Sequence, residues 1–273
     1  MRHSPSAPAP GVPLREYWEA ETCGTHYVDA EKFSKAYFDS IAAHRYRVEP
    51  FVRDFADFDR WRGKRGLEVG VGAGTDFVEF LRAGAEMSGV DLTKAAVQHV
   101  EQRAAAYGLP SPNVLQANAE QLPFTNDAFD FVYSFGVIHH ADNTWKVFDE
   151  IYRVTKPGGA IKIMVYNLDS TQVWLKWLHH AWAERKWRIG PGRGRRWALA
   201  NFQESGGTKG YTQRDIEREL ARYAHSDLRF SYDADRVQPG EPHELLSRVF
   251  RAIEPARMRW CLMFELTKRA VQT

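Results

Sequence analysis

An alternating series of small residues marks a candidate binding site for a nucleotide-like ligand. An apolar run ends in Glu68, Gly70, Gly72 and Gly74, and a helical pattern begins at about Thr75. Glycine has no Cβ atom, so the turn can be tight and a ligand can lie against bare backbone. The first turn of the following helix offers free N–H groups and a positive dipole end to that ligand.

A carboxylate stands at the end of the next apolar run, where it could accept both hydroxyls of a ribose. This residue is Asp91, and the order strand, turn, helix, strand over 65–91 is half of a nucleotide-binding βαβ unit. The glycine spacing differs from the Gly-x-Gly-x-x-Gly series of dinucleotide-binding proteins. A nicotinamide-dependent oxidoreductase is therefore the weaker interpretation of this unit.

Two adjacent histidines are candidate general bases. His139 and His140 follow the apolar run 128–135, which we interpret as a fourth strand. An imidazole with an ordinary pKa of about 6.5 can take a proton from a hydroxyl or a phenol. Because adjacent side chains point in different directions, we expect at most one to be catalytic, with His139 favoured and His140 second. A structural role near the start of the next helix is the alternative.

Strands and helices alternate along most of the chain, which predicts an α/β fold with a mostly parallel sheet. Beyond the first unit, we expect strands over 113–117, 128–135, 160–166, 228–232 and 259–267. We expect helices over 93–107, 143–154, 211–224 and 243–253, with Thr93 and Thr212 as N-caps. Lys156 to Gly159 should form a sharp turn.

The motifs from Arg65 to Tyr166 resemble those of the class I S-adenosylmethionine-dependent methyltransferases, and most closely the type 11 group. The glycine series is similar to the first motif of that family. Residues 118–124 resemble its Asp-Ala-Glu-x-Leu-Pro-Phe segment, and 151–159 resemble its Arg-Val-Leu-Lys-Pro-Gly-Gly turn. The family has Asp where this chain has Asn118, but an Asn carbonyl is still an acceptor.

The resemblance implies a Rossmann-like, seven-stranded, mostly parallel sheet of order 3-2-1-4-5-7-6 with helices on both faces. It implies S-adenosylmethionine as cofactor and no metal. In the family, the acid after the second strand holds the ribose and the residue at position 118 contacts the adenine. The implied cofactor-binding residues are Glu68, Gly70, Gly72, Gly74, Asp91, Leu92, Asn118, Ala119, Glu120 and Ser134.

The implied reaction is methyl transfer to a small molecule, with oxygen or nitrogen the expected acceptor atom. Tyr17, Trp18 and Tyr27 cluster near the N-terminus, where they either contact the substrate or anchor their segment to the core. The expected substrate-binding residues are Tyr17, Trp18, Tyr27, His139 and Tyr166.

Composition along the chain suggests how it is organised. We expect a disordered Pro/Ser/Ala-rich tail over 1–13, a helical lid over 14–60 that breaks near Pro50, and the methyltransferase domain over 61–273. Within that domain, 169–210 interrupts the alternation of strands and helices and is expected to form an inserted cap.

The inserted segment is rich in tryptophan and in basic residues. One interpretation is a cap over the substrate pocket, with its tryptophans packed inward and its cationic groups in water. The alternatives are a grip on an acidic or phosphorylated substrate and docking to an anionic membrane surface through 172–197. In the last case the chain could be a catalytically idle protein that keeps the cofactor fold.

The whole-chain composition gives further expectations. The formal net charge of +2 gives no reason to expect a nucleic-acid partner. Cys23 and Cys261 lie far apart in the sequence, which suits a reducing cytoplasm rather than a disulfide framework. No apolar run reaches the roughly 20 residues that span a bilayer. The oligomeric state is left open.

Overall fold

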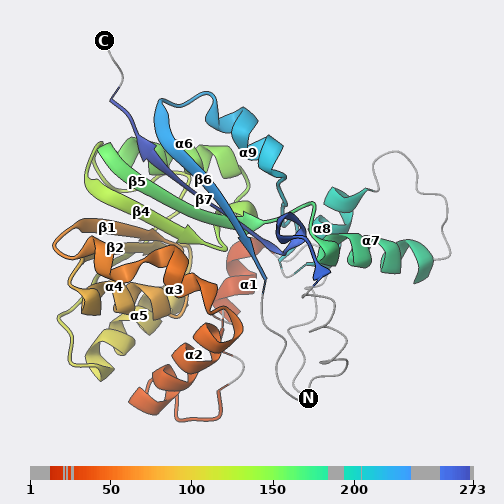
Figure 1. The fold of residues 1–273 in the computed structure, drawn as a ribbon. Helices are drawn as coiled ribbons and strands as arrows, with labels where there is room; N and C mark the ends of the chain where they lie inside the picture. The colour runs from red at the N-terminus through yellow and green to blue at the C-terminus, as the bar shows by residue number, and fades with distance from the viewer. Residues whose placement is uncertain are drawn as a thin grey trace.

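A seven-stranded sheet forms the centre of the computed structural model, which describes residues 13–20, 22, 24–25, 28–183, 194–203, 205–234 and 253–270. The strand order is β3-β2-β1-β4-β5-β7-β6, as the resemblance to class I methyltransferases implied (Figure 1). Strand β7 runs antiparallel to both of its neighbours, and the other pairs are parallel. The strands are β1 (Arg65–Val69), β2 (Glu86–Asp91), β3 (Asn113–Gln116), β4 (Phe129–Phe135), β5 (Thr155–Tyr166), β6 (His225–Asp233) and β7 (Cys261–Lys268).

Helices begin where the sequence supplies side-chain caps. The side chains of Ser34, Thr93 and Asn143 accept N–H groups of the helices that follow them, and Thr212 forms a capping box with Asp215. The main helices are α1 (Leu14–Ala20), α2 (Lys35–Val48), α3 (Phe51–Ala56), α4 (Thr75–Ala83), α5 (Lys94–Ala106), α6 (Thr144–Val154), α7 (Thr171–Ala183), α8 (Arg195–Phe202) and α9 (Gln213–Leu220). Short 3-10 turns are η1 (Phe58–Trp61), η2 (Ile138–His140) and η3 (Ala256–Met258).

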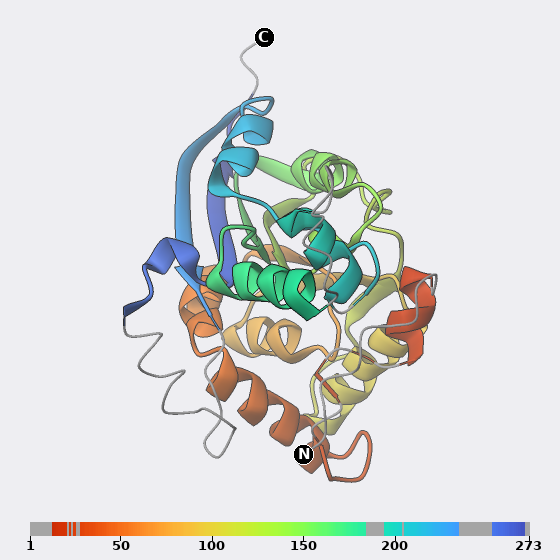
Figure 2. The same ribbon diagram turned by 90° about the vertical axis from the view of Figure 1, so that its right-hand side faces the viewer.

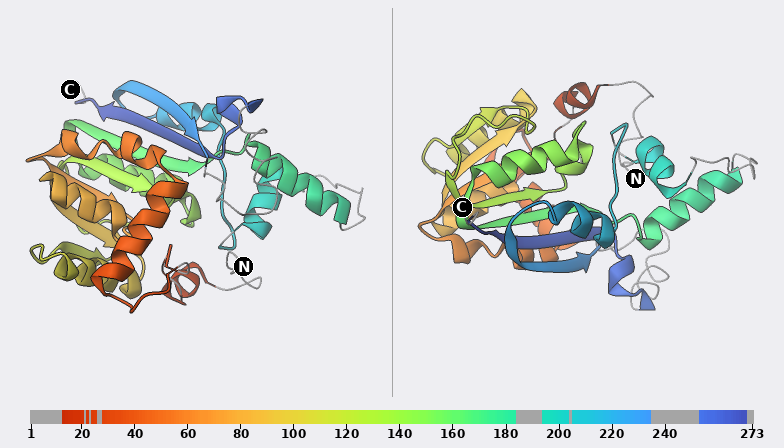
Figure 3. Two further views of the ribbon diagram at one scale, coloured as in Figure 1. Left: turned by 60° about the horizontal axis from the view of Figure 1, so that its bottom comes forward. Right: turned by 90° about the horizontal axis from the view of Figure 1, so that it is seen from above.

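Two apolar clusters cover the opposite faces of the sheet. In β4, Phe131 and Tyr133 belong to the cluster formed with α4 and α5, whereas Val132 belongs to the cluster formed with α6 and α9. All three side chains are fully buried, as expected for a strand covered on both faces. Figures 1 and 3 show these two helical layers with the sheet between them.

The carboxyl ends of the parallel strands open toward the same edge of the sheet. Figure 2 looks onto this edge, which is framed by α1 (red), α2 (orange), α7 (green) and α8 (teal). In open α/β sheets ligands bind at this edge, where the strand order reverses. Here the reversal lies between β1 and β4, so the fold directs attention to the loops after these strands.

Some expectations differ from the structure or fall outside it. The turn expected at Lys156 to Gly159 falls within β5 at a break in its pairing with β4, because Phe129 pairs with Thr155 while Phe131 already pairs with Ala160. The tail over 1–12, residues 184–193 of the insertion and most of the helix expected over 243–253 lie outside the described residues. Among the residues that are described, no helix has the length and apolar content to cross a bilayer.

Candidate active site

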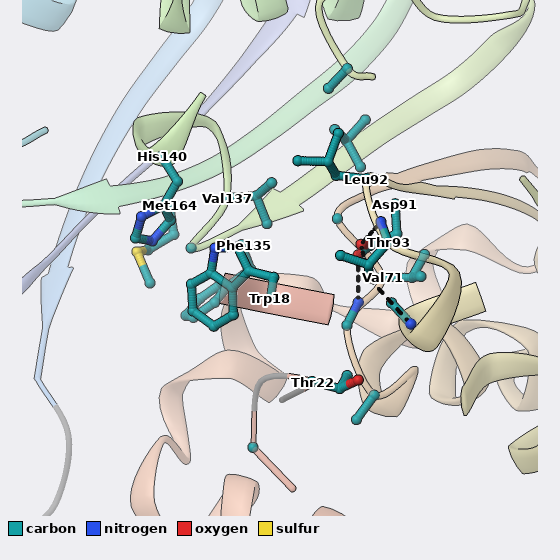
Figure 4. Close-up of a pocket in the computed structure, with 18 of the residues that line it drawn as sticks. Trp18, Thr22, Val71, Asp91, Leu92, Thr93, Phe135, Val137, His140 and Met164 are labelled. Carbon is teal, nitrogen blue, oxygen red and sulfur yellow. Dashed lines mark hydrogen bonds between the residues drawn. The ribbon is translucent and has the colours of Figure 1, made fainter. Parts of the chain in front are cut away.

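A cavity of about 990 Å³ lies at the carboxyl edge of the sheet. Its wall is formed by the residues at the ends of β1 to β5, the start of β7, and side chains of α1 and α2. Figure 4 shows Asp91, Leu92 and Thr93 toward one side of it, and Trp18, Phe135, His140 and Met164 toward the other.

The glycines of the loop after β1 have different roles. Gly72 lines the cavity with a left-handed φ of 50°, and no atom lies within 4 Å of the place that a Cβ would occupy. Gly74 does not line the cavity, contrary to our expectation. It caps α4, and a Cβ there would lie 2.8 Å from Val100 Cγ2 on α5. The missing Cβ of Gly74 therefore allows α4 and α5 to pack closely, whereas the missing Cβ of Gly72 leaves open space for a ligand.

Asp91 lines the cavity at the end of β2 and holds the glycine loop in place. Its Oδ2 accepts the Gly72 N–H at 3.1 Å, and its Oδ1 accepts the N–H and hydroxyl of Thr93 at 3.0 and 2.9 Å. Burial raises the pKa of Asp91 above its usual value, although these hydrogen bonds oppose the rise. A carboxylate oxygen can accept two donors, so Oδ2 keeps capacity for a ribose hydroxyl.

Glu68 lies on the cavity wall at the end of β1, and its side chain is buried. Among the described residues, no group donates to its Oε2. Burial, together with the negative charge of Asp76, raises the pKa of Glu68 well above its usual value. A cationic or hydrogen-bonding group of a ligand would satisfy this oxygen.

The loop after β3 forms another part of the cavity wall, at the end of the cavity that contains Asp91. Asn118, Ala119 and Glu120 line the cavity, and so does Leu92 after β2. The Asn118 Oδ1 accepts the Glu120 N–H at 2.9 Å, which is the turn contact typical of asparagine. Its second lone pair remains compatible with an adenine amine.

Ser134 does not fit the role in cofactor binding that we expected. Its fully buried hydroxyl donates to the Val69 carbonyl at 2.9 Å, inside the sheet between β4 and β1. The next residues, Phe135, Gly136 and Val137, line the cavity instead. Side chains alternate along a strand, so a shift of one residue decides which of them reaches the ligand.

The structure reverses the order of preference between the two histidines. The ring of His139 is fully buried against Tyr166, 4.0 Å between ring centroids, and is not part of the cavity wall. Neither of its nitrogens has a hydrogen-bond partner among the described residues. Burial, with smaller effects of His140 and Lys209, lowers the pKa of His139 well below its usual value. His139 therefore acts as a packed, neutral ring.

His140, unlike His139, lines the cavity. Its Nδ1 lies 2.8 Å from Ser205 Oγ and 3.1 Å from Thr208 Oγ1. Burial and the positive charge of Lys209 lower the pKa of His140 to about 3, so the imidazole is neutral at physiological pH. It is a hydrogen-bond partner rather than a cation.

Aromatic side chains surround the His140 end of the cavity. Trp18 meets the His140 ring edge-on at 5.5 Å, and Tyr166 stacks on Trp260 at 4.1 Å between centroids. Both Trp18 and Tyr166 line the cavity, whereas Tyr17 packs against Trp18 and is not among the wall residues. Tyr27 lies outside the described residues. Further wall residues have no motif around them that would have indicated this position; they include Thr22, Arg45, Met164, Gln172, Lys176, Gln203 and Trp260.

The fold and this cavity agree with comparisons to known proteins. Residues 67–163 match the family model described as a methyltransferase domain. These residues include Glu68, the glycine loop, Asp91 and the loop after β3. These matched residues form a methyltransferase domain of the kind that the sequence motifs resemble. The crystal structure of the YcgJ protein of Bacillus subtilis has the same fold, with a TM-score of 0.54 and 18% identity over 81% of this chain and 99% of that one.

Other known proteins match this chain over different shares of its length. The demethylmenaquinone methyltransferase of Geobacillus kaustophilus is 31% identical over 45% of this chain and 58% of its own. A phosphoethanolamine N-methyltransferase of Haemonchus contortus, solved with S-adenosylhomocysteine, aligns with a TM-score of 0.59 and 17% identity over 96% of this chain and 62% of its own. The chain spans 39% to 60% of the length of the first five curated relatives it matches.

The residues of the methyltransferase cavity fit S-adenosylmethionine. Gly72 leaves open space beside the loop, Asp91 offers a buried carboxylate, and Glu68 has an unsatisfied oxygen that suits an ammonium group. When bound, the cofactor supplies a methyl group that is already activated on a sulfonium. For such a transfer the protein has to align the acceptor with the methyl group.

Proposed function

We propose that the protein transfers the methyl group of S-adenosylmethionine to a hydroxyl or amine of a small molecule. One observation carries this proposal above the others. A single cavity joins the Gly72 and Asp91 end to the aromatic end at His140, so donor and acceptor can meet inside it. Enclosure in one pocket favours a small acceptor over a macromolecular one.

Each part of the cavity has a role in this reaction. Gly72 and Asp91 hold the adenosine part of the cofactor, and Glu68 binds its charged end. Trp18 and Tyr166 line the end of the cavity that receives the acceptor, with His140 at its reacting group. Helix α1 is held over the cavity because the Glu19 carboxylate accepts the N–H groups of Lys94 and Ala95 at 3.1 and 3.0 Å.

The low pKa of His140 favours an oxygen acceptor over an aliphatic amine. A neutral imidazole can accept a hydrogen bond from the acceptor's hydroxyl group. This hydrogen bond orients the hydroxyl oxygen toward the methyl group of the cofactor. As the new bond forms, the proton on that oxygen becomes far more acidic than an imidazolium, so even a base with a pKa of about 3 can take it. A methylated aliphatic amine would keep its proton. One relative is named as a demethylmenaquinone methyltransferase, which supports a small molecule as the substrate. The name does not indicate which atom of this protein's substrate accepts the methyl group.

The test is an activity screen with isotope-labelled S-adenosylmethionine against pooled small metabolites, analysed by mass. We expect label in the methyl ether of at least one hydroxyl-bearing metabolite. The matched variant is His140→Gln, which should bind the cofactor normally and transfer methyl about 100-fold more slowly. Normal cofactor binding with no labelled product from any pool would contradict the proposal.

One observation supports the alternative function, in which the protein is catalytically idle and docks to a membrane through the inserted segment. We expected its tryptophans to pack inward, but Trp174, Leu175 and Leu178 on α7 are 39%, 57% and 51% exposed. Their spacing places them on one side of the helix. Such a stripe can insert into an anionic membrane surface. Co-sedimentation of the wild type with phosphatidylserine vesicles, and its loss in the double variant Leu175→Gln/Leu178→Gln, would support membrane docking. If the wild type does not co-sediment, the docking alternative is wrong and the enzyme interpretation remains.

A further inference from the structure

Two hydroxyl groups from the insertion surround one nitrogen of His140. Ser205 and Thr208 follow α8 in sequence, 65 and 68 residues after the histidine, and their hydroxyl oxygens lie 2.8 and 3.1 Å from Nδ1. Both side chains are only 1% exposed. Water therefore does not compete for these hydrogen bonds, and the protein alone decides where each proton lies.

The proton of the Thr208 hydroxyl is already committed. Its Oγ1 lies 2.7 Å from the Ser205 carbonyl oxygen and 3.5 Å from that of Gln203. A carbonyl oxygen can only accept, so Thr208 must donate its single proton in this direction. Toward His140, Thr208 presents only lone pairs. The 3.1 Å contact is a hydrogen bond only if Nδ1 carries the hydrogen.

The position of Ser205 agrees with that assignment. With the hydrogen on Nδ1, the Ser205 and Thr208 oxygens share it, and Ser205 donates its own proton across the 3.3 Å contact to Thr208. Every polar hydrogen in the group then has an acceptor. In the other tautomer Ser205 would donate to Nδ1, and the lone pairs of Nδ1 and Thr208 would face each other at 3.1 Å. A buried lone-pair contact of this kind is unfavourable.

The backbone holds this hydroxyl pair against the histidine turn. The Lys209 N–H donates to the His139 carbonyl at 3.0 Å, and the Lys209 ammonium donates to the Ala141 carbonyl at 2.6 Å. The Gly207 N–H donates to the Ala200 carbonyl at 2.9 Å and fixes the loop to α8. The loop is therefore attached on both sides of His140, so the two hydroxyls cannot drift from the ring without breaking these bonds.

We propose that Ser205 and Thr208 are positioning residues that hold His140 as its Nδ1–H tautomer, so that Nε2 carries the lone pair that receives the acceptor's hydroxyl proton. This inference rests on the proposed function and deepens it. It assigns a task to the insertion, whose loop fixes the protonation of a group on the cavity wall. It also limits the acceptor to one with a hydrogen to give, because this tautomer offers Nε2 only as an acceptor.

Nitrogen NMR of the full-length protein tests the tautomer without any substrate. The protein is labelled with ¹⁵N-histidine, and long-range proton–nitrogen spectra distinguish a protonated Nδ1 from a protonated Nε2. The sequence holds 10 histidines, and the signal lost in His140→Gln identifies the right one. We expect a protonated Nδ1 and an unprotonated Nε2 in the wild type. A protonated Nε2 would overturn the proposal.

Two variants of Thr208 separate positioning from packing. Thr208→Val keeps the shape but removes the lone pairs, and we expect the tautomer ratio to move roughly five- to tenfold toward Nε2–H, the equivalent of one hydrogen bond. Thr208→Ser restores the hydroxyl and should restore the wild-type spectrum. An unchanged ratio in Thr208→Val would contradict the proposal. If that variant fails to fold, the wild-type spectrum still decides the tautomer.

Failure of this inference is distinguishable from failure of the proposed function. Calorimetry with S-adenosylmethionine reports on cofactor binding whatever the state of His140. If the cofactor binds but the wild-type histidine is protonated on Nε2, only the tautomer assignment is wrong. With an acceptor found by the activity screen, Thr208→Val should lower kcat without changing KM for the cofactor, and Thr208→Ser should recover it. Equal activity of Thr208→Val and wild type would overturn the positioning role.

Discussion

The Asp76 carboxylate accepts a two-pronged hydrogen bond from the Arg45 guanidinium, at 3.0 Å from Nε to Oδ1 and 2.6 Å from Nη2 to Oδ2. The hydroxyls of Tyr46 and Tyr133 donate to the same carboxylate at 2.9 and 3.0 Å. One buried group thereby ties α2, α4 and β4 together beside the cavity. Helix α2 is thus fixed to the core by charge as well as by apolar packing.

Asp76→Asn should destabilise the protein in a pH-dependent way. Burial alone would raise the pKa of Asp76, but Arg45 and the hydrogen bonds outweigh it and hold that pKa below 3.8. A lowered pKa stabilises the folded state above pH 3.8, and the contribution is lost as the pH falls through the folded value. We expect the variant to lose about 3 kcal/mol of unfolding free energy at pH 7. The difference should shrink in acid below pH 4.

Asp39→Asn is the matched control for this measurement. Asp39 pairs with Lys35 at 2.7 Å, but the two side chains are 50% and 65% exposed. Its loss should change the unfolding free energy by less than about 1 kcal/mol. Urea denaturation of both variants at neutral and acid pH gives the comparison. Equal effects of the two substitutions at pH 7 would show that the buried network does not hold the lid.

Glu68→Gln should stabilise the protein at neutral pH. Burial and the charge of Asp76 raise the pKa of Glu68 above 4.5, so the folded state holds this proton more tightly than the unfolded state does. Stability is therefore lost as the pH rises above the unfolded value. A neutral amide avoids that loss, and we expect a gain of about 1–3 kcal/mol at pH 8 and little at pH 4. Thermal denaturation at the two pH values measures it.

The stabilised Glu68→Gln variant should bind S-adenosylmethionine less tightly, because the charged acceptor for its ammonium is gone. Glu150→Gln serves as the opposite case. Hydrogen bonds from Arg153 lower the pKa of Glu150, so its replacement should cost stability at neutral pH and leave cofactor binding alone. If both substitutions changed the unfolding free energy at neutral pH in the same direction, this account of Glu68 would be wrong.

Gly72→Ala and Gly108→Ala form a pair that separates backbone strain from ligand space. Both glycines have left-handed φ angles, 50° and 65°, and a Cβ at either would meet no atom within 4 Å. Each substitution should cost about 1–2 kcal/mol of stability. Only Gly72 lines the cavity, so only Gly72→Ala should weaken cofactor binding, about tenfold or more. Equal binding by the two variants would mean that the loop does not contact the cofactor.

Local spacing was enough to predict the frame of the site. The glycine series, Asp91 and the Thr93 cap lie within one βαβ unit, where backbone geometry follows directly from the residue types. The capping box at Thr212 was likewise visible as a cap signal before α9. These features depend on neighbours a few residues away, so a single sequence displays them.

Contacts between distant segments were not predictable in the same way. Arg45 and Asp76 are 31 residues apart, and nothing in either neighbourhood indicates that they pair. Ser134 and His139 were misplaced by one residue each, because the phase of β4 and of the turn η2 decides which side chain reaches the cavity. The hydroxyls that surround His140 come from the insertion, which had no recognisable motif.

Calorimetric titration with S-adenosylmethionine, comparing the wild type with Asp91→Ala, tests the central claim most directly. The claim is that the glycine loop and Asp91 hold the cofactor at one end of the cavity. We predict measurable binding by the wild type and a loss of about 1.5–3 kcal/mol in the variant, because the ribose hydroxyls lose a charged acceptor. Absence of binding by the wild type, or an unchanged affinity in Asp91→Ala, would contradict the claim.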